Sequence, residues 1–439
     1  MHVAKNVRPF LILSLFVLAV VVPLSLTARG RGETDRSVAP VSEPDDGADA
    51  GEAPRRSPIR DGATEEMRRL SRIGAGLRTT GGRSTDVELP ERYHGQSPPR
   101  GAHQFSTDFS RALIDYSDVV AGGPPKDGIP SIDFPVFETV TVADEWLADA
   151  EPVIVVRRDG ETAVYPLQIL TWHEIVNDEI AGHPVSVTYC PLCNTGVAFD
   201  RRFDDLVLDF GVSGLLVFSN MIMYDRQTET WWVQATGRGV AGKFAGQQLA
   251  FVPSTLVSWS DARETHPDAR VLSRETGHRR DYGSNPYVGY DGAYEPFLYR
   301  GAPVVDTETE SPMTRVLTVY HGGDAAAYPF PILAERRVIE TLLDGKNIVV
   351  LWEEGTSSAL DTARLAEGRD VGTANAFYPD LNGRTLTFEV VDGEIRDKET
   401  GSRWNAAGSA VEGPLTGEQL EPALAIHHFL FSWRAFHPE

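Results

Sequence analysis

The sequence predicts an α+β fold in which strands predominate, made of two degenerate copies of one strand–helix–strand/β module packed together. Four observations support this prediction. Short runs with alternating apolar residues are frequent, Gly and Trp are common between them, and helix-forming stretches are scarce. In addition, a pattern of Gly, Pro and aromatic residues in the first part of the chain returns in the second part.

The repeat is clearest at residues 163–170 (AVYPLQIL), which return as residues 326–333 (AAYPFPIL). Further on, a series of Asp, Thr, Gly and Trp positions recurs in the same order with small gaps. We therefore expect one copy at about 137–267 and a second at about 314–438, joined by a connector rich in Tyr and Gly.

Within the first copy, residues 153–156 and 163–165 are expected to form strands around a hairpin turn at Asp159 and Gly160. Pro166 then suits the first turn of a helix and Gly182 its end. Apolar residues at helical spacing between them, from Ile169 to Ile180, predict one helix over 166–182 with His173 on its inward face.

The segment after this helix alternates as a strand over residues 185–189 and leads directly into Cys190. Short strand-like runs follow at 206–210, 215–218 and 221–224.

The N-terminus has the layout of an export signal. Lys5 and Arg8 precede an apolar run at 10–26, so residues 1–28 are predicted to be a signal peptide or an N-terminal membrane anchor. Residues 29–99 are rich in acidic residues, Arg, Pro and Gly, and segments such as 41–54 lack large apolar side chains, which predicts a linker. Residues 100–439 are then the globular domain, expected outside the cytoplasm and held at the membrane if the signal remains uncleaved.

Composition excludes several classes of protein. The 439 residues contain 63 Asp and Glu against 41 Lys and Arg, and the formal charge of −22 argues against a nucleic-acid partner. Two cysteines rule out a disulfide-stapled scaffold and a site with four thiolates from one chain. An acidic, Lys-poor composition suits a salty medium, although a GC-rich genome would produce the same preference for Arg.

Both cysteines lie in the sequence YCPLCNTG at 189–196. A C-x-x-C places two sulfurs within reach of one metal ion or of each other. Asn194 stands where a haem-attachment motif requires His, and the residues after Cys193 resemble a turn into another strand rather than the helix of a thioredoxin-like site.

The second copy lacks these groups. Glu353 and Glu354 stand in the region of the C-x-x-C, and Arg336 replaces His173. The fold therefore does not depend on the cysteines or the histidine, which favours a functional role for them in the first copy.

Three hypotheses follow. The first is a metal-binding or thiol-redox protein in which Cys190, Cys193 and His173 bind copper or zinc, with Met223 as a further candidate ligand. The second is an enzyme with Cys190 as nucleophile, His173 as base, and Asn177 or Asp178 orienting it. The third is a surface binding or structural module in which a Cys190–Cys193 disulfide pins the turn.

Other residues near these groups bear on the site. Tyr189 and Thr195 flank the cysteines and are expected to support the site, together with Asn177 and Asp178. Asn177 also occupies the second histidine position of the H-E-x-x-H pattern, which counts against zinc proteolysis.

The motifs WHEIVND at 172–178, YCPLCNTG at 189–196, FGVSG at 210–214 and RDYG at 280–283 resemble the prokaryotic family catalogued as domain of unknown function 3179. The resemblance extends from about residue 120 to the C-terminus. It implies an exported or membrane-anchored protein, and it assigns no activity, substrate, electron partner or cofactor.

Overall fold

The computed structural model describes residues 82, 83, 85, 87–300 and 311–437. These residues all fall in one compact unit that spans Pro58–Glu439. About 42 % of the structure is strand and about 15 % is helix, which confirms a β-rich fold with minor helical content. The predicted signal or anchor at 1–28 lies outside the described residues. Within the described part, no helix is long and apolar enough to cross a membrane.

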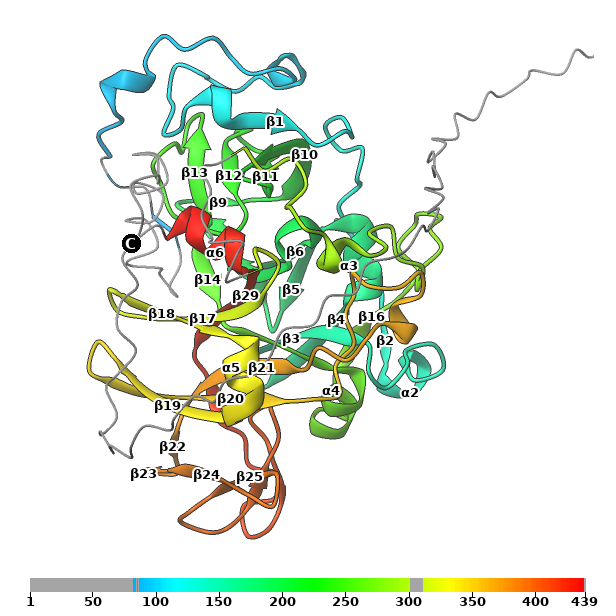
Figure 1. Cartoon of the computed structure of the whole chain (residues 1–439). Helices are drawn as coiled ribbons and strands as arrows, with labels where there is room; N and C mark the ends of the chain where they lie inside the picture. The colour runs from blue at the N-terminus through cyan, green and yellow to red at the C-terminus, as the bar shows by residue number, and fades with distance from the viewer. Residues whose placement is uncertain (1–81, 84, 86, 301–310, 438–439) are drawn as a thin grey trace, which may run out of the picture. The chain divides into compact units, whose positions relative to one another are not determined.

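The first half of the unit contains three main sheets (Figure 1). The first sheet has the order β15 (Ser254–Ser258), β3 (Pro152–Arg158), β4 (Glu161–Pro166), β16 (Arg270–Leu272) and β2 (Phe137–Thr139). The second has the order β14 (Ala250–Val252), β7 (Thr195–Asp200), β6 (His183–Cys190) and β5 (Ile175–Ile180). The third has the order β1 (Val119–Ala121), β10 (Phe210–Val217), β11 (Asn220–Asp225), β12 (Trp231–Val233) and β13 (Arg238–Ala241).

Short elements complete this half: β8 (Arg202–Phe203) with β9 (Leu206–Val207), and helices α2 (Val140–Ala143), α3 (Leu167–His173) and α4 (Trp259–Thr265). The predicted hairpin between β3 and β4 is confirmed. Its turn residues Asp159 and Gly160 have φ values of 46° and 84°, the left-handed geometry of a two-residue hairpin turn.

The second half contains three further main sheets. One has the order β18 (Asp324–Pro329), β17 (Arg315–His321) and β29 (Leu424–Phe429). Another has the order β19 (Val338–Leu343), β20 (Lys346–Glu353), β21 (Thr373–Tyr378) and β28 (Glu421–Pro422). The third has the order β24 (Phe388–Val391), β25 (Glu394–Asp397), β26 (Arg403–Trp404) and β27 (Ala410–Glu412), and the remaining elements are β22 (Asp380–Leu381), β23 (Arg384–Thr385), α5 (Phe330–Arg336) and α6 (Leu430–Phe436).

The recurring Asp, Thr and Trp positions build the same buried turn in each half. In the first, Asp225 accepts hydrogen bonds from the Thr228 amide at 2.6 Å and from Trp232 Nε1 at 2.9 Å. In the second, Asp397 accepts from the Thr400 amide at 2.6 Å and from Trp404 Nε1 at 3.0 Å. Both carboxylates are buried, so these donors compensate the loss of water and explain why the positions recur.

The two halves pack against each other through their matching strands. The β15 backbone at Leu256 exchanges hydrogen bonds with the side chain of Asn375 on β21, at 3.0 Å in each direction. Conversely, the Thr195 hydroxyl on β7 lies 3.1 Å from Nδ1 of His428 on β29. Side chains of the second half therefore reach the cysteine segment of the first half.

The prediction of one helix over 166–182 is wrong. The helix α3 ends at His173, Glu174 adopts a left-handed conformation with φ of 60°, and residues 175–180 form β5. The apolar residues in this window fit a helical spacing, but β-branched Ile175 and Val176 also suit a strand, and β5 pairs with β6 along its whole length. His173 is consequently the last residue of a short helix.

Candidate functional site

The two cysteines lie at the end of a central strand. Strand β6 ends at Cys190, the short 3-10 helix η4 (Pro191–Cys193) follows, and β7 begins at Thr195, which pairs with Cys190. Asn194 makes this tight return possible with a left-handed φ of 51°, and its side chain accepts a hydrogen bond from the Tyr189 hydroxyl at 3.1 Å. The predicted turn from the C-x-x-C into another strand is confirmed.

Both thiols are free and buried, and the two cysteines form a near pair at 4.1 Å. Burial, the neighbouring Cys193 and the nearby carboxyl of Glu174 raise the pKa of the Cys190 thiol well above its ordinary value. The Sγ atom of Cys190 also lies 3.9 Å from the carbonyl oxygen of Ser219. Cys190 is therefore protonated at neutral pH until a base removes the proton.

Glu174 is a titratable carboxyl group in this environment, and sequence reasoning missed it. Its carboxyl group is buried at the left-handed turn after α3 and accepts a hydrogen bond from the Tyr287 hydroxyl at 3.3 Å. Burial raises the pKa of Glu174 to about 7, with the Tyr287 hydrogen bond acting in the opposite direction. A carboxyl group that titrates near neutral pH can both accept and return a proton.

The connector between the halves covers this group. Tyr287 reaches Glu174, and the Tyr290 hydroxyl, in the 3-10 helix η5 (Tyr290–Gly292), donates to the carbonyl oxygen of Leu192 at 2.9 Å. The connector is itself held to the second half, because the Asn285 side chain donates to the Thr362 carbonyl oxygen at 2.8 Å. The cysteine loop is thus enclosed by residues from outside its own sheet.

His173 does not join the cysteines. Its Nδ1 lies 2.7 Å from the Pro130 carbonyl oxygen, to which it can only donate, so Nε2 accepts from the Tyr282 hydroxyl at 2.7 Å. Burial lowers the pKa of His173 to about 4, which keeps the ring neutral. Both ring nitrogens are therefore committed to a structural role between the first half and the connector.

The other predicted residues are dispersed. Asn177 donates to Asp133 Oδ1 at 2.7 Å and to the Phe210 carbonyl oxygen at 2.8 Å, which ties β5 to β10. Asp178 accepts from Tyr165 and pairs with Arg270 at 2.7 Å. These partners are groups other than the thiols.

Thr195 lies beside the cysteines, and Met223 belongs to the same large buried cluster. The Thr195 hydroxyl lies 3.2 Å from the Cys193 carbonyl oxygen and also contacts His428, whose buried Nε2 has no hydrogen-bond partner in the described part of the chain. Met223 belongs to the same buried cluster as both thiols, together with Met221.

A metal site with three protein ligands of the usual kinds is not assembled in the described residues. Nowhere in residues 82, 83, 85, 87–300 or 311–437 do three His, Cys, Asp or Glu side chains gather in an arrangement that could hold a metal ion. The sulfur atoms of Met221 and Met223 are candidate soft ligands, because both residues share one large buried cluster with Cys190 and Cys193.

The second half has different residues at the positions of Cys190 and Glu174. At the end of β20, Glu353 occupies the strand position that Cys190 has at the end of β6. Arg337 follows α5 with a left-handed φ of 60°, as Glu174 follows α3. The order of these elements is therefore the same in both halves, while the side chains at their junction differ.

Comparison with known proteins yields one match, to a family model. Neither the curated proteins nor the solved structures contain a match to the chain. The matching model is that of the family described as protein of unknown function (DUF3179), and it covers residues 126–439. The chain belongs to this family.

Proposed function

We propose that this protein is a thiol–disulfide redox protein in which Cys190 and Cys193 alternate between a dithiol and a disulfide. The observation that carries the proposal is the near pair of free thiols at 4.1 Å beside a carboxyl group with a pKa of about 7. A disulfide has an S–S length of about 2.05 Å, so the two cysteines have to approach each other before the bond can form.

The reaction is balanced with a low-molecular-weight disulfide as the oxidant. Glu174 accepts the proton of Cys190, and the Cys190 thiolate attacks one sulfur of the oxidant to form a mixed disulfide. The leaving thiolate takes up a proton. The sulfur of Cys193 then attacks that of Cys190, and the second thiol leaves, so that one dithiol and one small disulfide give one protein disulfide and two small thiols.

The cover over the thiols limits the reaction partner. Both cysteines are buried, and Tyr287 and Tyr290 of the connector pack against the buried cluster that contains them. A small oxidant needs only a local opening of this cover, whereas a folded protein disulfide needs the connector to move away. We therefore favour a small-molecule oxidant.

The nucleophilic enzyme has less support. His173, its expected base, bonds Pro130 and Tyr282 instead.

A second candidate function is the binding of Cu(I) by sulfur. It rests on the shared burial of Cys190 and Cys193 with Met221 and Met223, because thiolates and thioethers are the ligands that Cu(I) prefers. His173 takes no part in this version of the metal hypothesis.

Two further parts of the proposal concern where the protein is located and how its two halves are related. Export through the N-terminal segment would place the thiols where disulfides persist. We also infer that the two halves are copies of one module, because α3, β5 and β6 follow one another with the same lengths as α5, β19 and β20.

The test is the mass of the full chain purified without reductant or chelator. A mass lighter by two hydrogens that dithiothreitol reverses, and that Cys190→Ser and Cys193→Ser abolish, supports the redox pair. Added mass of one copper ion supports the second candidate. A fully reduced, metal-free chain after incubation with oxidised glutathione contradicts the redox proposal.

A further inference from the structure

The second half contains a cavity that the redox chemistry does not use. It has a volume of 560 Å³ and lies between the start of β17, helix α5, the end of β20 and the loop at 369–372. Cavities of this size hold small organic molecules, and they typically combine an apolar wall with a few polar groups that fix the ligand.

One end of the cavity carries two guanidinium groups. Nη2 of Arg315 donates to Asp291 Oδ2 at 3.0 Å and to Ser358 Oγ at 2.8 Å, while no hydrogen-bond partner is found for its Nη1 in the described residues. Nη1 of Arg369 donates to the same Asp291, to Oδ1 at 2.9 Å. The two like charges are therefore held together by one buried carboxylate.

The charge of Asp291 is secured by its surroundings. Burial opposes ionisation, but the hydrogen bond from Ser358 and the charges of Arg315 and Arg369 together lower the pKa of Asp291. Its carboxylate is only 1 % exposed, so this end of the cavity is prearranged.

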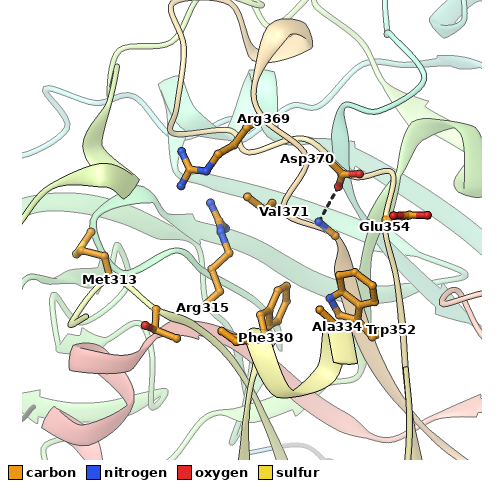
Figure 2. A pocket seen from close by; sticks show the side chains of 12 residues that line it. Met313, Arg315, Phe330, Ala334, Trp352, Glu354, Arg369, Asp370 and Val371 are labelled. Carbon is orange, nitrogen blue, oxygen red and sulfur yellow. Dashed lines mark hydrogen bonds between the residues drawn. The ribbon is translucent and has the colours of Figure 1, made fainter. Parts of the chain in front are cut away.

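The other end of the cavity is acidic. Glu354 is exposed, and within the described part of the chain it has no ion-pair or hydrogen-bond partner. Asp370 accepts hydrogen bonds from the Gly355 amide at 2.7 Å and the Gly372 amide at 2.8 Å. Figure 2 shows the two guanidinium groups on one side, these carboxylates on the other, and Phe330, Ala334 and Trp352 along the wall between them.

The charge balance selects among ligands. Asp291 and Asp361 both pair with the arginines, so a simple anion meets no excess of positive charge, and a simple cation meets the guanidinium groups. A carboxylate at Arg315 and an ammonium group at Glu354 would satisfy both ends, with an apolar body against the wall.

We propose that this cavity binds a zwitterionic molecule with an apolar body, of the size and chemistry of a short peptide with an aromatic side chain. Its carboxylate accepts from the free side of Arg315, and its ammonium group lies at Glu354 and Asp370. This inference is independent of the redox proposal.

The test is calorimetric titration of the full chain with the dipeptide alanyl-phenylalanine. Its N-acetyl derivative and its C-terminal amide each lack one charge, and each is expected to bind about tenfold more weakly, the usual cost of one charged hydrogen bond. Saturable binding of the dipeptide with this order of affinities supports the proposal. No binding at millimolar dipeptide, or equal binding of the amide, overturns it.

Variants locate the site. Ala334→Trp fills the cavity and should abolish binding, whereas Glu335→Trp, on the same exposed side of α5 but outside the cavity lining, should bind as the native chain does. Glu354→Gln should weaken the dipeptide but leave the N-acetyl derivative unchanged. Dipeptide binding that survives Ala334→Trp would place the ligand elsewhere and overturn the proposal.

Discussion

The two halves of the protein have the same order of elements around one junction, between a short helix and the end of a strand, but they have different side chains there. Where α3 meets the end of β6, the first half encloses two thiols and a carboxyl group under tyrosines of the connector. Where α5 meets the end of β20, the second half leaves a cavity with charged ends. Because the buried Asp–Trp turns and the paired strands supply the stability, the side chains at this junction can differ between the halves.

The largest effects are expected where the halves are alike. Trp232→Ala and Trp404→Ala each remove a fully buried indole that bonds a buried aspartate, so each should lower the free energy of unfolding by about 3–5 kcal/mol. Urea unfolding measures both. If one substitution is nearly neutral, the two turns do not contribute equally to stability, which contradicts the view that both halves are stabilised in the same way.

The next effect is a pH dependence shared by two glutamates. Burial raises the pKa values of Glu174 and Glu353 from 4.5 to about 7, so the folded protein holds these protons more tightly than the unfolded chain. The stability this contributes is present below pH 4.5 and is lost as pH rises to about 7. Relative to the native chain, Glu174→Gln and Glu353→Gln should each gain up to about 3 kcal/mol across this range.

The same pair separates stability from chemistry. Only Glu174→Gln should slow the oxidation of the thiols by oxidised glutathione, because Glu353 lies in the other half. Equal oxidation rates in Glu174→Gln and the native chain would remove Glu174 from the mechanism.

A smaller effect tests the cover of the site. Tyr287→Phe removes the hydroxyl that donates to Glu174 and should cost about 1.5 kcal/mol of stability. Since this hydrogen bond lowers the pKa of Glu174, its loss should move the midpoint of the pH–rate profile for thiol oxidation upward. Tyr290→Phe, which loses a bond to Leu192 instead, is the matched control. A shift of the midpoint in Tyr290→Phe alone would be inconsistent with the assigned geometry.

The smallest effect concerns Met223. Met223→Leu conserves volume in the buried cluster and should change the free energy of unfolding by less than about 1 kcal/mol. Disulfide formation should be unchanged. A loss of copper from the purified variant would instead favour the sulfur-bound Cu(I) candidate.

Local sequence signals predicted much of the framework. The Asp159–Gly160 hairpin, the strand that leads into Cys190 and the turn that follows Cys193 depend on neighbouring residues, and the structure contains them. The helix prediction failed beyond His173 because the run from Ile175 to Ile180 satisfies a helical spacing and a strand propensity together. Pairing of β5 with β6, a tertiary interaction, decides between them.

The site was harder to predict for the same reason. The C-x-x-C stood out because its spacing is local, whereas Tyr287, Tyr290 and His428 reach the cysteine segment from more than 90 residues away. Glu174 lies inside a motif that the sequence does display, but its importance depends on burial at the left-handed turn after α3. A polar residue between a short helix and a β-branched run was the available signal.

A redox titration shows directly whether Cys190 and Cys193 form a reversible redox pair. The full chain is equilibrated in glutathione buffers of stepped potential, quenched with an alkylating reagent and weighed. A reversible pair gives a single two-electron transition between a chain with two alkylated thiols and a chain with none. This transition should be absent in Cys190→Ser. The chain is unfolded during the quench so that buried thiols can react. If both thiols are then alkylated at every potential, Cys190 and Cys193 do not form a redox pair.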